Sequence, residues 1–141
     1  MLQSENVTEN GPHPISTLGR ERQVLVVDDN NTNRWAVSRM LVSLGHKVTL
    51  AGNGFEGGIL FLTSSYDLAI IHLDVPQMNV WELARILKEH SPKTPVIVAT
   101  GLNKGEPLAE LGRDKADAII PKPFMLKELE GTVQRLLSSG I

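Results

Sequence analysis

Short β-branched apolar runs alternate along the chain with longer amphipathic stretches, and Gly, Pro, Asp or Asn bounds each run. The apolar runs predict strands near residues 24–27, 48–50, 68–73, 96–99 and 118–120. The amphipathic stretches predict helices near residues 31–44, 55–64, 80–90, 106–113 and 125–138. Strands and helices that alternate at this spacing imply right-handed βαβ crossovers. We therefore predict an α/β fold, a three-layer sandwich around a five-stranded parallel sheet.

Two positions and one segment refine this organisation. Gly45 stands where a left-handed residue would end the first helix, and Pro107 suits the first turn of another. Residues 1–21 are polar and rich in turn formers, without a sustained period. We interpret residues 1–21 as a disordered tail or linker and residues 22–141 as one domain.

Composition narrows the classes of protein. A chain of 141 residues with 41% hydrophobic residues fits one globular domain. The formal net charge of −2 argues against wrapping by nucleic acid or polybasic attachment to a membrane. No apolar window approaches the roughly 18 residues of a membrane span, and the first residues do not resemble a secretory signal. The chain has no cysteine, so we expect a cytoplasmic protein without thiolate chemistry.

Polar residues stand at the ends of several predicted strands, where open parallel sheets bind ligands. Asp28 and Asp29 follow the first strand, and Asp74 follows the third. Thr100 and Lys122 follow the fourth and fifth strands. If the first and third strands are neighbours, three carboxylates share one crevice and attract a divalent cation. Mg²⁺ suits the crevice because it prefers oxygen ligands and shares them with phosphate.

Position separates the roles of these carboxylates. The side chains of Asp28 and Asp29 diverge, so one at most lies centrally, whereas Asp74 ends the most apolar strand. Asp74 is therefore the better nucleophile, which would accept a phosphoryl group as an aspartyl phosphate. Mg²⁺ and Lys122 would neutralise the charge on phosphoryl oxygens. The hydroxyl of Thr100 would donate a hydrogen bond to a third phosphoryl oxygen.

Each of these residues also has a purely structural interpretation. The acidic pair could belong to a helix N-terminus that residues 30–32 cap equally well. Asp74 could be a turn residue, Thr100 a loop start and Lys122 a surface charge. The functional interpretation is favoured because all of these residues belong to one edge of one predicted sheet.

Residues 23–137 resemble the receiver domain of two-component response regulators and hybrid sensor kinases. Residues 24–34 (VLVVDDNNTNR) are similar to the opening strand, acidic pair and helix start of that family. Residues 95–101 (PVIVATG) resemble its fourth strand with a switch hydroxyl, and residues 120–124 (IPKPF) its Lys-Pro signature. The resemblance implies a flavodoxin-like (βα)5 fold. The acidic motif behind a polar tail is most similar to a receiver from a hybrid histidine kinase.

The resemblance implies a phosphorelay function. Asp74 would be the phosphoacceptor, and Asp28, Asp29 and Asp74 would surround Mg²⁺. Thr100 and Lys122 would sense the phosphate. The phosphoryl donor would be a histidine kinase or a histidine phosphotransfer protein. The chain would then be a relay module rather than a free-standing enzyme, with self-phosphorylation and dephosphorylation chemistry, and the resemblance leaves room for a weak homodimer.

The loop after Asp74 departs from the family pattern. Pro76 follows Asp74 after one residue, so the loop is shortened by about two residues, and Val80 stands where the family has Gly. The shortened part includes the backbone carbonyl that completes the family's metal shell. The carbonyl of Pro76 is the remaining candidate at that offset, and we hypothesise a weakened affinity for Mg²⁺.

The fifth strand region also bears on switching. The resemblance implies a cis peptide bond between Lys122 and Pro123, which proline makes accessible. Ile119 stands where many receivers have an aromatic residue that moves with the hydroxyl. Signalling would then run through loop backbone alone, or be weak.

Three further features have alternative interpretations. Residues 52–57 spell G-x-G-x-x-G, the pattern of a dinucleotide site, and also match the family's Asn-Gly-x-Glu turn, which we prefer. Trp35 is either an exposed docking anchor beside the acidic pocket or a residue packed on a neighbouring helix. His72 lies within a predicted strand with no second histidine at ligand spacing, so we prefer a buried, hydrogen-bonded core histidine to a metal ligand.

Besides a dinucleotide-binding enzyme, the sequence supports two hypotheses about function. The first is a phosphoacceptor that switches partner interactions when Asp74 is phosphorylated. The second is a degenerate receiver, a phosphorylation-independent module for protein binding. The complete set of site residues favours the first hypothesis, and the shortened loop favours the second.

Overall fold

The computed structural model describes residues 21–72, 79–100, 116–121 and 124–139, and within them strands and helices alternate as predicted. The strands are β1 (Gln23–Val27), β2 (Lys47–Ala51), β3 (Leu68–His72), β4 (Val96–Thr100) and β5 (Ala118–Pro121). The helices are α1 (Asn31–Ser43), α2 (Gly54–Thr63), α3 (Val80–His90) and α5 (Leu126–Ser139). These bounds differ from the predicted ones by at most one residue at either end. The predicted tail up to residue 20, and the predicted helix at 106–113 with Pro107, lie outside the described residues.

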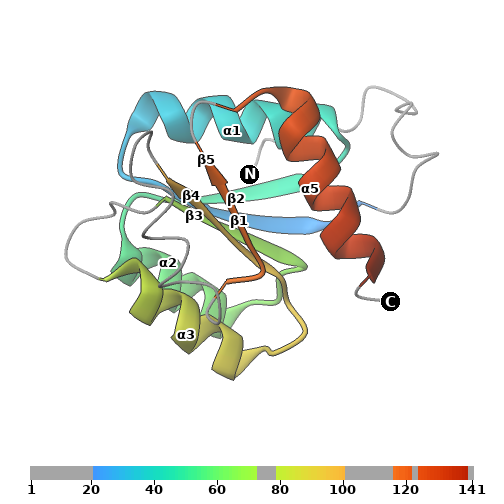
Figure 1. Ribbon diagram of the computed structural model, residues 1–141. Coiled ribbons are helices and arrows are strands. Elements are labelled where there is room, and N and C mark those ends of the chain that lie inside the picture. Colours follow the sequence, from blue (N-terminus) through green and yellow to red (C-terminus); the bar gives the residue numbers. More distant parts are fainter. Residues whose placement is uncertain (1–20, 73–78, 101–115, 122–123, 140–141) are drawn as a thin grey trace.

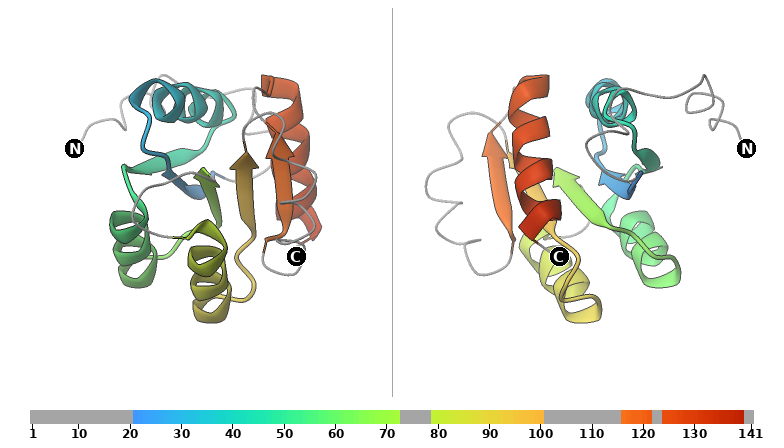
Figure 2. Two further views of the ribbon diagram at one scale, coloured as in Figure 1. Left: turned by 60° about the vertical axis from the view of Figure 1, so that its left-hand side comes forward. Right: turned by 90° about the vertical axis from the view of Figure 1, so that its right-hand side faces the viewer.

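The five strands form one parallel sheet in the order β2-β1-β3-β4-β5. Helices α1 and α5 cover one face of the sheet, and α2 and α3 cover the other (Figures 1 and 2). The three-layer α/β prediction is therefore confirmed. The chain reverses its direction of winding between β1 and β3, and such a reversal leaves a crevice at the carboxyl ends of the two strands.

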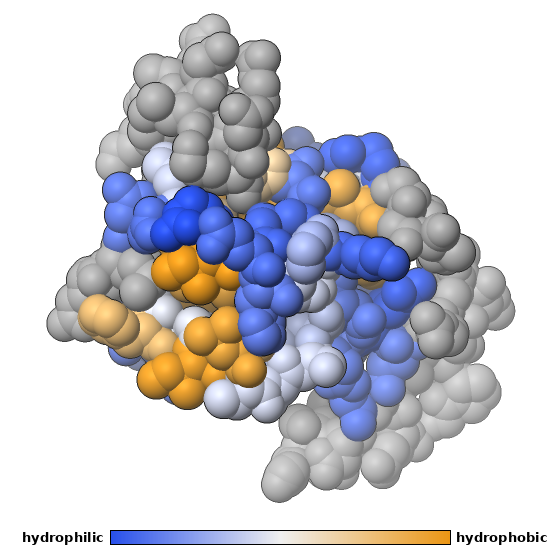
Figure 3. All heavy atoms as spheres, turned by 90° about the horizontal axis from the view of Figure 1, so that it is seen from below, coloured by the Kyte–Doolittle hydropathy of each residue, from blue (hydrophilic) through white to orange (hydrophobic). Residues whose placement is uncertain are grey.

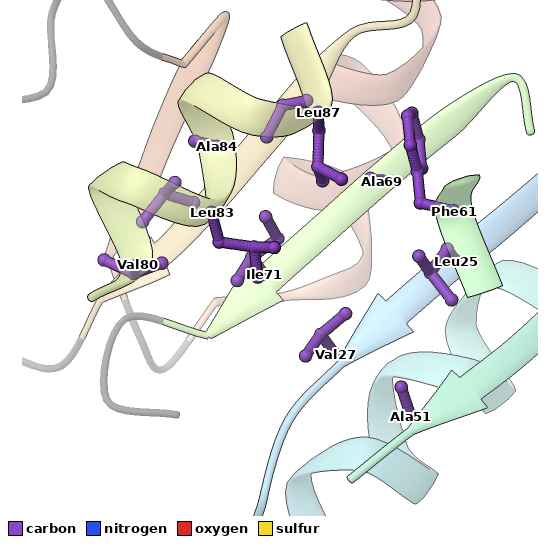
Figure 4. Packing of buried hydrophobic residues seen from close by; sticks show 12 residues of the cluster. Leu25, Val27, Ala51, Phe61, Ala69, Ile71, Val80, Leu83, Ala84 and Leu87 are labelled. Atoms are coloured by element: carbon purple, nitrogen blue, oxygen red, sulfur yellow. The ribbon is translucent and has the colours of Figure 1, made fainter. Parts of the chain in front are cut away.

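Each face of the sheet has its own apolar core, because side chains of a strand alternate between the two faces. We call these the α2/α3 core and the α1/α5 core. In Figure 4, Leu83 and Leu87 of α3 point toward the sheet, and Leu83 lies over Ile71. The α2/α3 core consists of Leu25, Val27, Ala51, Phe61, Ala69, Ile71, Val80, Leu83, Ala84, Leu87, Val96 and Val98. The α1/α5 core consists of Val24, Val26, Val37, Leu41, Leu68, Ile70, Ile97, Ala99, Ile120, Leu129, Val133 and Leu136.

The ends of α1 follow the signals in the sequence. Asn30 is the N-cap, and its side-chain oxygen accepts a hydrogen bond from the backbone N–H of Asn33 at 2.9 Å. Gly45 has a φ of 92°, the left-handed conformation that glycine adopts at low cost. Gly45 donates its backbone N–H to the carbonyl of Val42, so the predicted helix end is confirmed.

One face of α2 exposes a stripe of apolar side chains to solvent. Phe55, Ile59 and Leu62 are each between 46% and 63% exposed and follow one another at helical spacing. Apolar atoms gather on this side of the molecule in Figure 3. In the described part of the chain, no helix is long and apolar enough to cross a membrane.

His46, in the turn between α1 and β2, makes stability depend on pH. Burial lowers the pKa of His46 below its usual value of 6.5, the charge of Arg22 lowers the pKa further, and Glu21 and Asp67 oppose this. The His46 Nδ1 accepts a hydrogen bond from the backbone N–H of Arg22 at 3.2 Å. The folded protein therefore binds this proton more weakly than the unfolded chain. The resulting stability is present above pH 6.5 and is lost as the pH falls through the lowered pKa.

We expect the free energy of unfolding to decrease from about pH 7.5 to about pH 5.5 more steeply in the wild type than in His46→Gln. A glutamine amide oxygen can accept the same hydrogen bond and does not titrate. Urea unfolding of both proteins at the two pH values measures this difference. Equal slopes for the two proteins would contradict the assignment to His46.

Candidate functional site at the carboxyl edge of the sheet

The site lies where β1 and β3 end side by side. Val27 of β1 pairs in register with Ile71 of β3, so the next residues along the strands, Asp28 and His72, are neighbours. Side-chain alternation assigns both residues to the face of the α1/α5 core, because Val26 and Ile70 belong to that core. The neighbouring β1 and β3 that the carboxylate hypothesis required are therefore present.

Asp28 is the buried acid of the pair. Its side chain is only 3% exposed, whereas Asp29 is exposed. One carboxylate oxygen of Asp28 accepts a hydrogen bond from the backbone N–H of Asn30 at 2.9 Å. Its backbone carbonyl accepts a hydrogen bond from the Arg34 guanidinium. These contacts hold the carboxylate in one place at the strand end, as a ligand site requires.

Asn30 is the N-cap of α1, and neither acid takes that position. Asn30 caps α1, and its backbone carbonyl also accepts from the N–H of Arg34 at 2.9 Å. The carboxylates of Asp28 and Asp29 are therefore not needed as the N-cap. Asp28 is buried at the strand end and accepts the N–H of Asn30, and its role as a metal ligand stays a prediction.

Thr100 belongs to the same edge of the sheet. It is the last residue of β4, is 1% exposed, and pairs in register with Pro121 of β5. Ile119 is partly buried against the α2/α3 core. The hydroxyl that the sequence singled out therefore lies in the sheet itself, and not just beyond it.

The structure leaves several predicted site residues without a description. Asp74 and Pro76 fall within residues 73–78, and Lys122 and Pro123 form another gap, so all four lie outside the described residues. Their assigned roles and the cis peptide bond stay predictions. Asp28, Asp29 and Thr100 lie at the predicted edge.

The interpretation of His72 as a buried core residue is wrong. His72 is only half-buried, and a ring nitrogen of His72 and carboxylate oxygens of Asp28 and Asp29 all lie within 4.8 Å of one another. A signal for this was present in the sequence. His72 follows Leu68 and Ile70 at strand alternation, as Asp28 follows Val24 and Val26.

The donor atoms at this edge suit a divalent cation. Two carboxylates within 4.8 Å of each other repel when both are ionised, and a cation between them removes that repulsion. Carboxylate oxygens are the ligands that Mg²⁺ prefers, and Mg²⁺ keeps several waters, so a small set of protein ligands is sufficient. The residues present therefore fit a magnesium site.

The glycine-rich turn before α2 is filled by the protein itself. The backbone N–H of Gly52 donates to the Glu56 carboxylate at 2.7 Å, and the N–H of Glu56 donates to the Asn53 side chain at 2.8 Å. These N–H groups are the ones that would cradle a phosphate in a dinucleotide site. A Cβ on Gly57 would meet Val27 at 2.6 Å, so this glycine serves the packing of α2 on the sheet.

Trp35 is an exposed aromatic on α1, close in sequence to the acidic pair. Its side chain is 62% exposed, and the Arg39 guanidinium lies over its ring at 5.5 Å from the centroid. Trp35 is therefore exposed rather than packed on a neighbouring helix, and its role as a docking anchor stays a prediction. Trp81, which also opens a helix, is partly buried against the α2/α3 core.

Comparison with known protein families identifies the family of this chain. The model of the response regulator receiver domain matches residues 24–134. The chain belongs to the response regulator receiver domain family. Receiver domains are the phosphoacceptor modules of two-component systems, and the flavodoxin-like fold expected from the resemblance is confirmed.

Curated and solved relatives agree with this membership. The receiver is 33% identical over 137 residues to the sensor histidine kinase AtsR of Burkholderia thailandensis, covering 92% of this chain and 22% of that protein. It is 33% identical over 121 residues to the transcriptional regulatory protein CusR of Escherichia coli, covering 84% of this chain and 52% of that protein. The chain thus spans between a fifth and a half of these curated relatives.

A solved receiver shows the same fold. The receiver domain of sensor histidine kinase PA1611 from Pseudomonas aeruginosa superposes with a TM-score of 0.76 at 24% identity, over 84% of this chain and 99% of that one. That structure holds a magnesium ion coordinated in its active site cleft. At this identity the comparison speaks for the fold alone.

Proposed function

We propose that this receiver accepts a phosphoryl group on Asp74 from a phosphohistidine of a partner protein, in the presence of Mg²⁺. The observation that supports this most is the buried Asp28 carboxylate beside Asp29 at the reversal point of the sheet. Thr100 at the end of β4 supplies a hydroxyl on the same edge. Asp74 follows β3, whose end adjoins β1.

Phosphoryl transfer from the phosphohistidine to Asp74 needs no third reactant. A carboxylate oxygen of Asp74 forms a bond to phosphorus as the bond from phosphorus to the donor's imidazole nitrogen breaks, and the imidazole leaves with that electron pair. Asp28 and Asp29 would hold Mg²⁺, which neutralises charge on the phosphoryl oxygens when bound. Thr100 and Lys122 donate hydrogen bonds to those oxygens in this proposal, and the Lys122-Pro123 bond is cis.

The proposal also covers the domain bounds, the parent protein, the phosphoryl donor and the cellular location. Residues 22–141 form the receiver behind a tail of residues 1–21, and similarity to a sensor histidine kinase over 137 residues supports an origin in a hybrid kinase. The phosphoryl donor is a histidine kinase or a histidine phosphotransfer protein. A cytoplasmic location belongs to the proposal, because a cysteine-free sequence suits a reducing compartment.

A second candidate is a degenerate receiver that binds a partner without phosphorylation. The shortened loop after Asp74 favours it, since Pro76 is the remaining candidate for the metal-binding carbonyl. The loop lies outside the described residues, and the weakened affinity for Mg²⁺ stays part of the proposal. Phosphorylation chemistry separates the two candidates directly.

Intact-protein mass spectrometry after incubation with acetyl phosphate tests the proposed function. We expect one phosphoryl adduct on the wild type with Mg²⁺, no adduct when a chelator removes Mg²⁺, and no adduct on Asp74→Asn. The reason is that an amide lacks the nucleophilic oxygen of a carboxylate. An unmodified wild type, under conditions that label another receiver, would instead favour the degenerate candidate.

Trp35 is the proposed anchor for the phosphohistidine partner, because it is exposed on α1 near the acidic edge. Aromatic side chains often dominate the energy of such contacts. We expect Trp35→Ala to slow phosphoryl transfer from a phosphorylated histidine phosphotransfer protein by about 10-fold or more. Phosphoramidate, a small donor that needs no docking surface, should label both proteins at one rate, so slowing with both donors would contradict the docking role.

A further inference from the structure

We propose that His72 adds an imidazole nitrogen to the metal site of Asp28 and Asp29, so that the receiver binds Zn²⁺-like divalent cations selectively through this residue. The inference rests on the proposed magnesium site and changes its ligand set. An oxygen-only site and a site with one nitrogen ligand differ in the cations they prefer. Within the described residues, the histidine on β3 is therefore a determinant of metal selectivity.

Backbone register places the imidazole beside the acids. Val27 pairs with Ile71, and the two residues that follow, Asp28 and His72, project to the face of the α1/α5 core. On the other side, His72 pairs in register with Ala99 of β4. The position of His72 is thus set by strand pairing, which is rigid, and not by a loop.

Distances allow one ion to reach all three side chains. A ring nitrogen of His72 and one oxygen of each acid lie within 4.8 Å of one another. Two ligands at about 2.1 Å from a tetrahedrally coordinated ion are about 3.4 Å apart. A pair of ligand atoms at the 4.8 Å limit would therefore need to approach each other by roughly 1.4 Å. Asp29 is exposed, so rotation of its side chain can supply such a movement.

Ligand chemistry determines which ions gain from His72. Imidazole nitrogen suits Zn²⁺, Ni²⁺ and Cu²⁺, whereas Mg²⁺ takes carboxylate, carbonyl and water oxygens. His72 can therefore strengthen the binding of Zn²⁺ without a matching gain for Mg²⁺. Asp28, as the buried acid, serves both ions.

The test compares Zn²⁺ and Mg²⁺ binding by isothermal titration calorimetry at one pH for the wild type, His72→Leu and His90→Gln. Leucine suits the apolar pattern of β3, and His90 is an exposed histidine at the end of α3. We expect His72→Leu to weaken Zn²⁺ binding by about 10- to 100-fold while Mg²⁺ binding stays unchanged. We expect His90→Gln to leave this Zn²⁺ site as it is.

A second readout identifies the ligand atom. Nitrogen NMR of the histidine rings should show a ring nitrogen of His72 shifting with Zn²⁺, a response that a merely structural role would not produce. Equal Zn²⁺ affinity in the wild type and His72→Leu, or an unshifted His72 ring, would overturn the inference. So would tighter Mg²⁺ binding in His72→Leu, since His72 would then compete with the cation rather than bind it.

Failure of the inference and failure of the proposed function are separable. The phosphoryl adduct with Mg²⁺ and acetyl phosphate is measured on the wild type independently of Zn²⁺. An adduct together with Zn²⁺ affinity that ignores His72 would overturn the inference and leave the phosphoacceptor function intact. The absence of an adduct would count against the phosphoacceptor function alone, because the Zn²⁺ titration does not depend on it.

Discussion

The Asp28→Asn receiver is expected to lose affinity for Mg²⁺ by about 10- to 100-fold or more, and to form little phosphoryl adduct with acetyl phosphate at Mg²⁺ levels that saturate the wild type. Asp28 is the buried acid of the edge, at 3% exposed. Removing its charge removes a fixed negative ligand where water cannot substitute freely. Mg²⁺ titration followed by calorimetry, and intact mass at several Mg²⁺ concentrations, measure the two effects.

The substitution is chosen so that the fold survives. The Asn30 backbone N–H donates to an oxygen of Asp28 at 2.9 Å, and an asparagine at position 28 retains an acceptor for that bond. Asp29→Asn is the matched control, because Asp29 is adjacent and exposed. We expect it to weaken Mg²⁺ binding less. An equal loss in both variants would show that burial does not distinguish the two acids.

The Gly57→Ala variant is expected to have a lower free energy of unfolding than the wild type. Overpacking costs about 1–3 kcal/mol, and the higher helix propensity of alanine offsets about 0.5–1 kcal/mol of that cost. A Cβ at position 57 would meet Val27 Cγ2 at 2.6 Å and Cγ1 at 3.2 Å. Val27 is 1% exposed in the α2/α3 core, so it cannot retreat without displacing its neighbours. Urea unfolding measures the change as a shift of the midpoint.

The neighbouring Gly58→Ala variant is the control for this packing argument. A Cβ at position 58 would lie 3.7 Å from Leu83 Cδ1, an ordinary contact distance. Alanine should therefore stabilise α2 by about 0.5–1 kcal/mol through its helix propensity. Opposite shifts at adjacent positions of one helix isolate the contact with Val27. A stabilised Gly57→Ala would mean that α2 can move away from β1.

Local patterns along the chain determined the elements and much of the edge chemistry. The β-branched runs and the helical spacing predicted the described strands and helices to within one residue, because burial on both faces demands continuous apolar strands. The Gly45 signal predicted the end of α1. The polar residues that end β1 and β4 followed directly, because all strands of a parallel sheet end at one edge.

Strand order was decided by the tertiary structure. The sequence left open whether the first and third strands were neighbours, because hydrophobic period reports burial and not which strand pairs with which. The pairing of Val27 with Ile71 settled the matter. It also joined His72 to Asp28, which are 44 positions apart in the chain, and overturned the view of His72 as a core residue.

The glycine-rich turn before α2 shows the same contrast between what the sequence and what the tertiary structure determined. The sequence by itself indicated that residues 52–57 form a turn before a helix, and the structure shows Asn53 as the N-cap of that helix. Only the tertiary structure decided why Gly57 is glycine, since the contact with Val27 joins segments from different strands and helices. The physical reason is common to both cases. Propensity and periodicity act along the chain, whereas register and close packing act between segments that the fold assembles.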